Sequence, residues 1–397
     1  MKGDFKMKRI VSLALAFAII ALMGVSTPAL QTTDGETLSY GYENPDGLEV
    51  SAASAMLIEA KTGTVLYTKN QDEKRSPASV TKIMTLLLVC EAIEDGRIST
   101  DDTVTISQYA ASMGGSQVFL EEGECFTVEE LLKCTVIASA NDAAVALAEK
   151  VAGSEGNFVA EMNSRAKALG MKNTTFENVT GLDDTTVNHL TTAEDIAIMS
   201  MELLKYEIIT RYSSLWQDSI RDGEFTLTNT NRLVRFYEGC NGLKTGSTEK
   251  AGYCVSASAK RDGMELIAVI MGADTRDVRN AEARALLDYG FANYALYEKA
   301  EATLEKIRVK FGTRDAADIK RVGFCKVVKR SDIKGIEEFF DIPSTAAAPM
   351  QKGDSVGKIT YKIGGIEIGA SDIVISEDIE RLSFFDLLLR IIKNTVK

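Results

Sequence analysis

The chain has 397 residues, of which 45% are hydrophobic, a fraction that suffices for a globular core. Its 45 lysine and arginine residues and 57 aspartate and glutamate residues give a net charge of −12. Because a duplex-binding surface needs clustered cations for phosphate contacts, nucleic acid is not expected as a partner. The length favours two folded domains with short terminal segments.

The N-terminus has the order of a secretory signal. Basic residues come first, an apolar run from Ile10 to Val25 follows, and small residues occupy positions 26–29. This order predicts a signal peptide over residues 1–29 and a linker over 30–49, so the remaining chain is expected to be exported. The alternative is an uncleaved anchor, although the apolar run is shorter than the roughly 20 residues of a spanning helix.

Six cysteines follow the signal, an even number that permits disulfides in an exported protein. However, Cys90, Cys134 and Cys254 lie in apolar stretches, where a free cysteine behaves as a small hydrophobe. We therefore expect free thiols rather than a disulfide framework.

The first predicted elements are a hairpin and a buried helix. Strands over 55–58 and 64–67 flank a turn that Gly63 supplies. Residues 79–93 carry apolar side chains on every face, which is typical of a central helix with protein on all sides.

More helices and a second hairpin follow. Helices are expected over 128–138 and 142–152, and another helix should begin after Thr192, with Thr192 as N-cap and Asp195 returning to it. Strands on either side of the turn 261–263 form the second hairpin. Strands at both ends of a helical middle predict one α/β domain, which we place at residues 50–296.

The pattern of apolar residues changes after residue 296. Short alternating runs, such as 307–311 and 359–368, predict a small all-β domain over 297–382. The stretch 344–350 is expected to be a loop within it.

Residues 383–397 predict an amphipathic helix. Asp386, Arg390, Lys393 and Lys397 fall on one stripe, and large apolar residues cover the rest. At 1.5 Å per residue such a helix is about 22 Å long, too short to span a bilayer but suited to its interface. We expect it to attach the protein peripherally to the outer face of the cytoplasmic membrane; packing on its own domain is the alternative.

Nucleophilic catalysis by serine usually needs a histidine base, and this chain has one histidine, His189. Its place just before a predicted helix cap favours a structural role. The presence of a single histidine also argues against a zinc site, and we expect no metal and no cofactor. A lysine can replace histidine if burial lowers its pKa, and Ser79 and Lys82 are spaced to share one helix face.

The order of three motifs selects this pair. Ser-x-x-Lys also begins at Ser164, Ser247, Ser331 and Ser355, so the pattern alone is weak. Ser-x-Asn occurs once, and Lys-Thr-Gly occurs once after it. One ordered set therefore remains, and its members are Ser79, Lys82, Ser139, Asn141, Lys244, Thr245 and Gly246.

The sequence around these motifs resembles the serine D-alanyl-D-alanine carboxypeptidases among the low-molecular-mass penicillin-binding proteins. The resemblance is close over about 50–296, looser in the β domain, and includes a C-terminal helix similar to that family's membrane anchor. It implies a β-lactamase/transpeptidase-like domain with an antiparallel sheet and a helical cluster. The segments that carry it are 75–85, 139–143, 162–163, 169–171, 242–246 and 251–253.

The resemblance also implies roles. Ser79 would attack the peptide bond between the two terminal D-alanines of peptidoglycan stem peptides, and neutral Lys82 would take its proton. Ser139 would relay that proton to the leaving amine, and Asn141 would orient Lys82 and the substrate. The substrate-binding residues would be Lys244, Thr245, Gly246 and Ser247, with backbone N–H groups of Ser79 and Ser247 forming the oxyanion hole.

β-Lactams would acylate the same serine. Two positions depart from the family pattern: Asn241 stands where an acidic residue is common, and Thr230 where some relatives carry arginine. Alternatives on the same scaffold are a D,D-endopeptidase or a β-lactamase. The alternative of another class is a non-catalytic, membrane-bound cell-wall-binding protein.

Overall fold

The computed structural model describes residues 47–184 and 186–395. The signal peptide predicted over 1–29 and all but the end of the linker predicted over 30–49 lie outside the described residues. Within the described part of the chain, no helix is both long enough and apolar enough to cross a bilayer.

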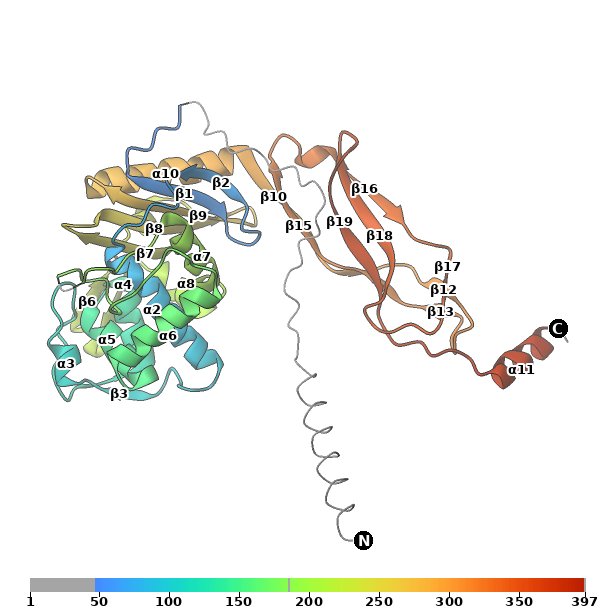
Figure 1. Ribbon diagram of the computed structural model, residues 1–397, viewed down its shortest axis with the longest axis horizontal. Coiled ribbons are helices and arrows are strands. Elements are labelled where there is room, and N and C mark those ends of the chain that lie inside the picture. Colours follow the sequence, from blue (N-terminus) through green and yellow to red (C-terminus); the bar gives the residue numbers. More distant parts are fainter. Residues whose placement is uncertain (1–46, 185, 396–397) are drawn as a thin grey trace, which may run out of the picture. The chain divides into compact units, whose positions relative to one another are not determined.

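A five-stranded antiparallel sheet forms the centre of the first domain (Figure 1). The two predicted hairpins supply four strands, and the third motif lies on the fifth, at the sheet edge. In spatial order the strands are β2 (Val65–Lys69), β1 (Ser54–Glu59), β9 (Met264–Ala273), β8 (Gly252–Arg261) and β7 (Cys240–Thr248).

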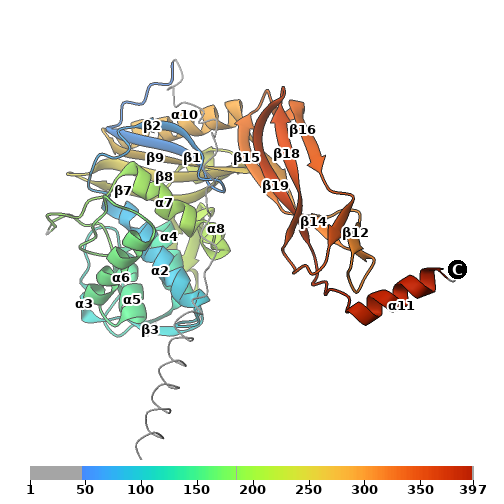
Figure 2. The ribbon, with the colours of Figure 1, turned by 45° about the vertical axis from the view of Figure 1, so that its right-hand side comes forward.

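Alternation along β9 separates two hydrophobic cores. Ile267 and Val269 belong to the core shared with the helical cluster, whereas Leu266 and Ala268 belong to the core under α10 (Arg276–Asn293). Successive strand residues point to opposite faces, so both faces of β9 are buried. Figures 1 and 2 show α10 on one face of the sheet and the helical cluster on the other.

The helical cluster surrounds α2 (Lys82–Glu94), whose Leu86, Leu87 and Val89 are all buried. The predicted helix over 79–93 is confirmed, except that Ser79 lies in a 3₁₀ turn, Ala78–Thr81, that leads into it. The other helices of this domain are α3 (Gln108–Ala111), α4 (Val128–Ile137), α5 (Asn141–Ala152), α6 (Glu155–Ala168), α7 (Ala193–Leu203), α8 (Glu207–Ser213) and α9 (Leu233–Phe236). Two ribbons add β3 (Thr103–Thr105), β4 (Cys125–Thr127), β5 (Gln217–Ile220) and β6 (Phe225–Thr228).

The prediction for the start of α7 was half right. Thr192 is its N-cap and accepts from the Asp195 N–H, as expected. The Asp195 carboxylate does not return to Thr192 but accepts from the Asn173 N–H and the Thr174 hydroxyl. A loop distant in sequence therefore occupies the carboxylate that a local capping box would use.

From β10 on, the described elements are almost entirely strands. β10 pairs with β15, β12 lies between β13 and β17, and β11-β14-β19-β18-β16 form a five-stranded sheet. The stretch 344–350, expected to be a loop, contains the short strand β17, because its backbone pairs in parallel with β12. The bounds are β10 (Tyr294–Lys299), β11 (Ala302–Thr303), β12 (Ile307–Lys310), β13 (Ala316–Ala317), β14 (Ile319–Arg321), β15 (Phe324–Lys329), β16 (Ile336–Asp341), β17 (Thr345–Ala347), β18 (Ser355–Ile363) and β19 (Ile366–Ile375).

The last described element is helix α11 (Phe384–Thr395), in the segment where an amphipathic helix was expected. The Ser383 hydroxyl caps it by accepting from the Asp386 N–H. All six cysteines are free thiols.

Candidate active site

The Lys82 side chain is fully buried and ends beside Ser79. Its Nζ lies 3.0 Å from Ser79 Oγ, 2.6 Å from Asn141 Oδ1 and 2.9 Å from the Thr180 carbonyl oxygen. Each of these three neighbours is a neutral polar group. The first two motifs are therefore in direct contact, as the family resemblance implied for Asn141 and Lys82.

This environment favours the neutral amine. Burial holds the pKa of Lys82 well below its ordinary value, and the positive charge of Lys244 lowers it further, against a smaller opposing effect of Asp142. Removing an ammonium group from water disfavours its charged form unless an opposite charge compensates. A neutral Lys82 amine has a lone pair with which to accept the Ser79 proton.

Close packing against β7 places Ser79 at the third motif. A Cβ atom at Gly246 would lie 2.8 Å from the Ser79 backbone nitrogen and 2.8 Å from the Pro77 carbonyl oxygen. Because no real Cβ atom approaches backbone so closely, only glycine allows β7 to cross the turn at this distance. Thr245 and Ser247 are thereby brought to the two sides of this crossing.

The second motif lies in the tight turn between α4 and α5. Ser139 has a φ of 62°, a left-handed conformation that is unusual for a residue with a side chain. The Asn141 side-chain amide donates to the Gly114 carbonyl (2.7 Å), which leaves its oxygen facing Lys82. The neighbouring Asp142 carboxylate is buried and accepts from backbone N–H groups of residues 118 and 120, which holds the adjoining loop in place.

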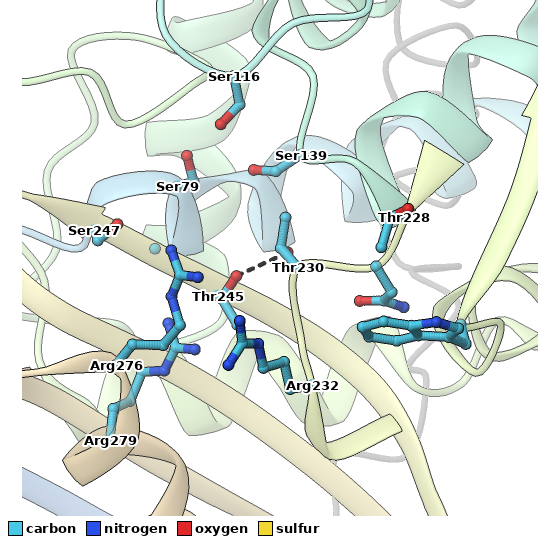
Figure 3. Close-up of a pocket in the computed structure, with 13 residues that line it drawn as sticks. Ser79, Ser116, Ser139, Thr228, Thr230, Arg232, Thr245, Ser247, Arg276 and Arg279 are labelled. Atoms are coloured by element: carbon cyan, nitrogen blue, oxygen red, sulfur yellow. Dashed lines mark hydrogen bonds between the residues drawn. The ribbon is translucent and has the colours of Figure 1, made fainter. Parts of the chain in front are cut away.

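Lys244 is a second buried lysine. Burial lowers its pKa to about 7, and the charge of Arg279 adds to this effect. Its Nζ donates to the Thr245 carbonyl (3.0 Å), and the Thr245 hydroxyl donates to the Thr230 hydroxyl (2.8 Å; Figure 3). Thr230, one of the two departures noted above, thus lies in the site, whereas Asn241 pairs with Ser258 and Glu265.

A cavity of about 410 Å³ brings the predicted residues together. Five of them line it, and the other three are buried. Lys82 contacts Ser79 and Asn141, and Lys244 contacts Thr245. Figure 3 shows Ser79, Ser116 and Ser139 gathered on one side of the cavity, and Arg276 and Arg279 entering from α10 on the other. The lining residues that sequence reasoning did not select are Ser116, Trp216, Thr228, Asn229, Thr230, Arg232, Arg276 and Arg279.

The arginines are the most informative of these omissions. Arg279 is only 3% exposed, and it donates to the Cys254 carbonyl and the Asn280 side chain. Among the described residues, neither Arg276 nor Arg279 forms an ion pair with a carboxylate. Two cations in the first turn of a helix oppose its dipole, and this anomaly in the sequence could have marked an anion site.

His189 lies outside the cavity wall and is buried. Burial lowers its pKa to about 4, so it is neutral at physiological pH. Among the described residues, His, Cys, Asp and Glu side chains form no group of three that could hold a metal.

Comparison with known proteins identifies the family. Residues 41–275 match the family model described as D-alanyl-D-alanine carboxypeptidase, and residues 291–381 match the C-terminal domain of penicillin-binding protein 5. The chain belongs to the D-alanyl-D-alanine carboxypeptidase family. The expected D-alanyl-D-alanine carboxypeptidase activity, that of a serine peptidase, is confirmed by this family match and by the names of the relatives.

Relatives match this carboxypeptidase over nearly its whole length. D-alanyl-D-alanine carboxypeptidase DacF of Bacillus subtilis is 42% identical over 97% of this chain and 98% of its own. DacA of Escherichia coli is 31% identical over 98% of each chain. The structure of penicillin-binding protein 5 from Haemophilus influenzae covers 86% of this chain and all of its own, with a TM-score of 0.73 at 29% identity. The expected fold class is therefore confirmed.

The two buried lysines predict a bell-shaped pH profile for this carboxypeptidase. Activity that needs neutral Lys82 rises with pH through its depressed pKa, and activity that needs charged Lys244 falls through a pKa of about 7 in the free enzyme. Lys244→Arg should remove the alkaline limb and keep the acid limb, because guanidinium stays charged. We would measure kcat/KM on a D-Ala-D-Ala peptide from pH 5 to pH 10. An unchanged alkaline limb in the variant would show that another group causes it.

Proposed function

We propose that Ser79 is the acylated nucleophile and Lys82 its general base in the removal of the terminal D-alanine from peptidoglycan stem peptides. The observation that carries this proposal is the 3.0 Å distance between Lys82 Nζ and Ser79 Oγ, with the amine buried and its pKa depressed. A serine and a base within hydrogen-bond reach, with the base oriented by a third group, form the arrangement that nucleophilic catalysis requires.

Acylation begins with attack of Ser79 Oγ on the carbonyl carbon of the penultimate D-alanine, as Lys82 Nζ takes the hydroxyl proton. The negative charge then forms on the carbonyl oxygen. The backbone N–H groups of Ser79 and Ser247 stabilise it, and each such donor contributes roughly 3–4 kcal/mol in comparable sites.

Breaking the peptide bond requires a proton for the leaving amine. Ser139 lies in the cavity wall and passes this proton from Lys82 to the nitrogen of the terminal D-alanine. Asn141 holds Lys82 through its side-chain oxygen. Water then attacks the acyl-enzyme, with Lys82 again as base, and regenerates Ser79 as the shortened peptide leaves.

The terminal carboxylate of the substrate is held by the positive end of the cavity. The Thr245 hydroxyl, which donates to Thr230 in the free enzyme, donates to this carboxylate instead. Arg276 and Arg279 in the cavity wall supply positive charge, and the buried Lys244 adds to it. These cations come from β7 and α10, so recognition of the carboxylate does not need an arginine at the position of Thr230.

β-Lactams present a strained amide and a carboxylate in a similar shape, so they acylate the same serine. Penicillin-binding protein D2 of Listeria monocytogenes, whose structure is described as an ampicillin-bound form, is 31% identical over 62% of this chain, with a TM-score of 0.57. This likeness supports the proposal for the first domain.

Ser79→Ala should abolish covalent labelling by penicillin and hydrolysis of D-Ala-D-Ala peptides, because the Ser79 hydroxyl is the one that, among the described residues, hydrogen-bonds to the Lys82 amine. Intact-protein mass after incubation with the antibiotic measures the labelling. Ser164→Ala, at another Ser-x-x-Lys sequence, is the matched control and should label as the wild type does. Labelling that persists in Ser79→Ala would overturn the assignment.

We also propose that the mature protein is held peripherally at the outer face of the cytoplasmic membrane by α11. Five apolar side chains of this helix are exposed, and those of Phe384 and Phe385 are each 74% exposed. Burying such side chains in a bilayer interface contributes about 25 cal/mol per Å² of apolar area, or several kcal/mol in total. Arg390 donates to the Gly312 carbonyl and pairs with Asp315, which ties the helix to the β domain.

Deleting residues 383–397 should release an enzyme that still hydrolyses D-Ala-D-Ala peptides, because every proposed active-site residue lies before the deletion. The mature full-length protein should float with anionic liposomes, and added salt should weaken that binding only in part, since apolar burial is not screened. Loss of folding on truncation, or failure of the full-length protein to float at low salt, would instead make α11 a packing element.

A further inference from the structure

Thr81 lies between the proposed nucleophile and base in the first motif, yet no catalytic step uses it. Its side chain is completely buried, and its hydroxyl donates to the Ala78 carbonyl oxygen at 2.8 Å. The same hydroxyl oxygen lies 2.8 Å from Nε2 of His189, which is also buried. A buried chain of hydrogen bonds therefore runs from His189 through Thr81 to the residue that precedes Ser79.

The direction of each hydrogen bond follows from the histidine. Nδ1 of His189 accepts from the Glu177 backbone N–H at 3.0 Å, so the single ring proton of the neutral imidazole is on Nε2. Nε2 must then donate to Thr81 Oγ1. That leaves the Thr81 hydroxyl proton free to point at the Ala78 carbonyl.

The Ala78 carbonyl matters because it shares a peptide unit with the Ser79 N–H. This peptide bond is trans, so its C=O and N–H point in opposite directions. A hydrogen bond that holds the carbonyl inside the protein therefore turns the Ser79 N–H the other way, toward β7 and the cavity. That N–H is one of the two proposed oxyanion-hole donors.

Holding the peptide unit is necessary because its conformation is intrinsically unfavourable. Ala78 has a φ of 47°, in the left-handed region that residues other than glycine disfavour. Gly181 packs directly on its carbonyl, since a Cβ atom there would lie 1.8 Å from the oxygen. Polar contact from Thr81 and steric contact from Gly181 thus both act on this one oxygen.

We propose that His189 and Thr81 are positioning residues that orient the Ser79 N–H for stabilisation of the oxyanion. This inference rests on the proposed roles of Ser79 and of its N–H group. The hydrogen-bonded chain from His189 through Thr81 to the Ala78 carbonyl, called the relay below, does not contact substrate and transfers no proton. The relay acts on the transition state rather than on the bound substrate, because negative charge develops on the carbonyl oxygen only as Ser79 attacks.

Matched variants at Thr81 separate hydrogen bonding from packing. Thr81→Ser keeps the hydroxyl and loses a methyl group, whereas Thr81→Val keeps the shape and loses the hydroxyl. Removing an oxyanion-hole donor costs about 10²–10³ in rate, so misorienting one should slow acylation in Thr81→Val by roughly 10-fold or more. We expect Thr81→Ser to acylate within a few-fold of the wild type.

The readout is stopped-flow acylation by a chromogenic cephalosporin, which separates the acylation rate constant from the dissociation constant of the non-covalent complex. The relay predicts a lower rate constant in Thr81→Val with an unchanged dissociation constant. It also predicts weaker binding of a boronic acid, whose tetrahedral adduct places an oxygen in the oxyanion hole. A role in packing alone predicts the opposite order, with Thr81→Val closer to the wild type than Thr81→Ser.

His189 provides a second pair of variants if Thr81→Val does not fold. His189→Gln retains an amide donor for Thr81 and should acylate faster than His189→Leu, which has none. Equal acylation rate constants within both pairs of folded variants would overturn the relay while Ser79 remained the labelled residue. Labelling that persists in Ser79→Ala would instead overturn the proposed function, so the two failures are distinguishable.

Discussion

The burial of the Lys82 amine without a carboxylate partner is the constraint on which the rest of the site depends. A charged ammonium in that position would lose its hydration and gain only neutral oxygens in return. The acidic group that acts on it, Asp142, already accepts hydrogen bonds from the backbone of a neighbouring loop. The amine therefore favours its neutral form, in which a lysine can act as the base that accepts the serine proton, the role that histidine usually has.

Three separate parts of the fold maintain this arrangement. The 3₁₀ turn before α2 presents Ser79, the turn between α4 and α5 presents Ser139 and Asn141, and edge strand β7 closes the site through Gly246. An edge strand has one side free of a neighbouring strand, so an extended peptide can lie along it. Positive charge from β7 and α10 then suits a substrate that ends in a carboxylate.

The sequence predicted the elements whose signals are local. The buried helix followed from apolar residues on every face, the hairpins from alternating runs around glycine turns, and the motif residues from their order along the chain. Five of the eight predicted site residues line one cavity, and the other three, Lys82, Asn141 and Lys244, are buried. The two lysines were assigned different roles from sequence, and the structure adds that each is buried and has a depressed pKa.

What sequence reasoning missed depends on contacts between distant segments. Arg276 and Arg279 reach the cavity because α10 begins after the end of β9, which lies at the same end of the sheet as the end of β7. The Asp195 carboxylate was assigned to a local cap but serves residues 173 and 174. His189 was expected to be structural, and it lies buried outside the cavity wall. Its hydrogen bond to Thr81 could not be foreseen, because the two residues are 108 positions apart.

The charge state of Lys82 tests the account most directly. Lysine side chains labelled with ¹³C and ¹⁵N can be titrated by NMR in the full-length mature protein, and Lys82→Arg would identify the Lys82 signal by its loss. The account predicts that Lys82 titrates well below 10.5, the value of a lysine in water, and is largely neutral in the resting enzyme at the pH of its activity. A pKa of Lys82 at or above 10.5 would contradict the account, because a permanently charged amine cannot accept the Ser79 proton.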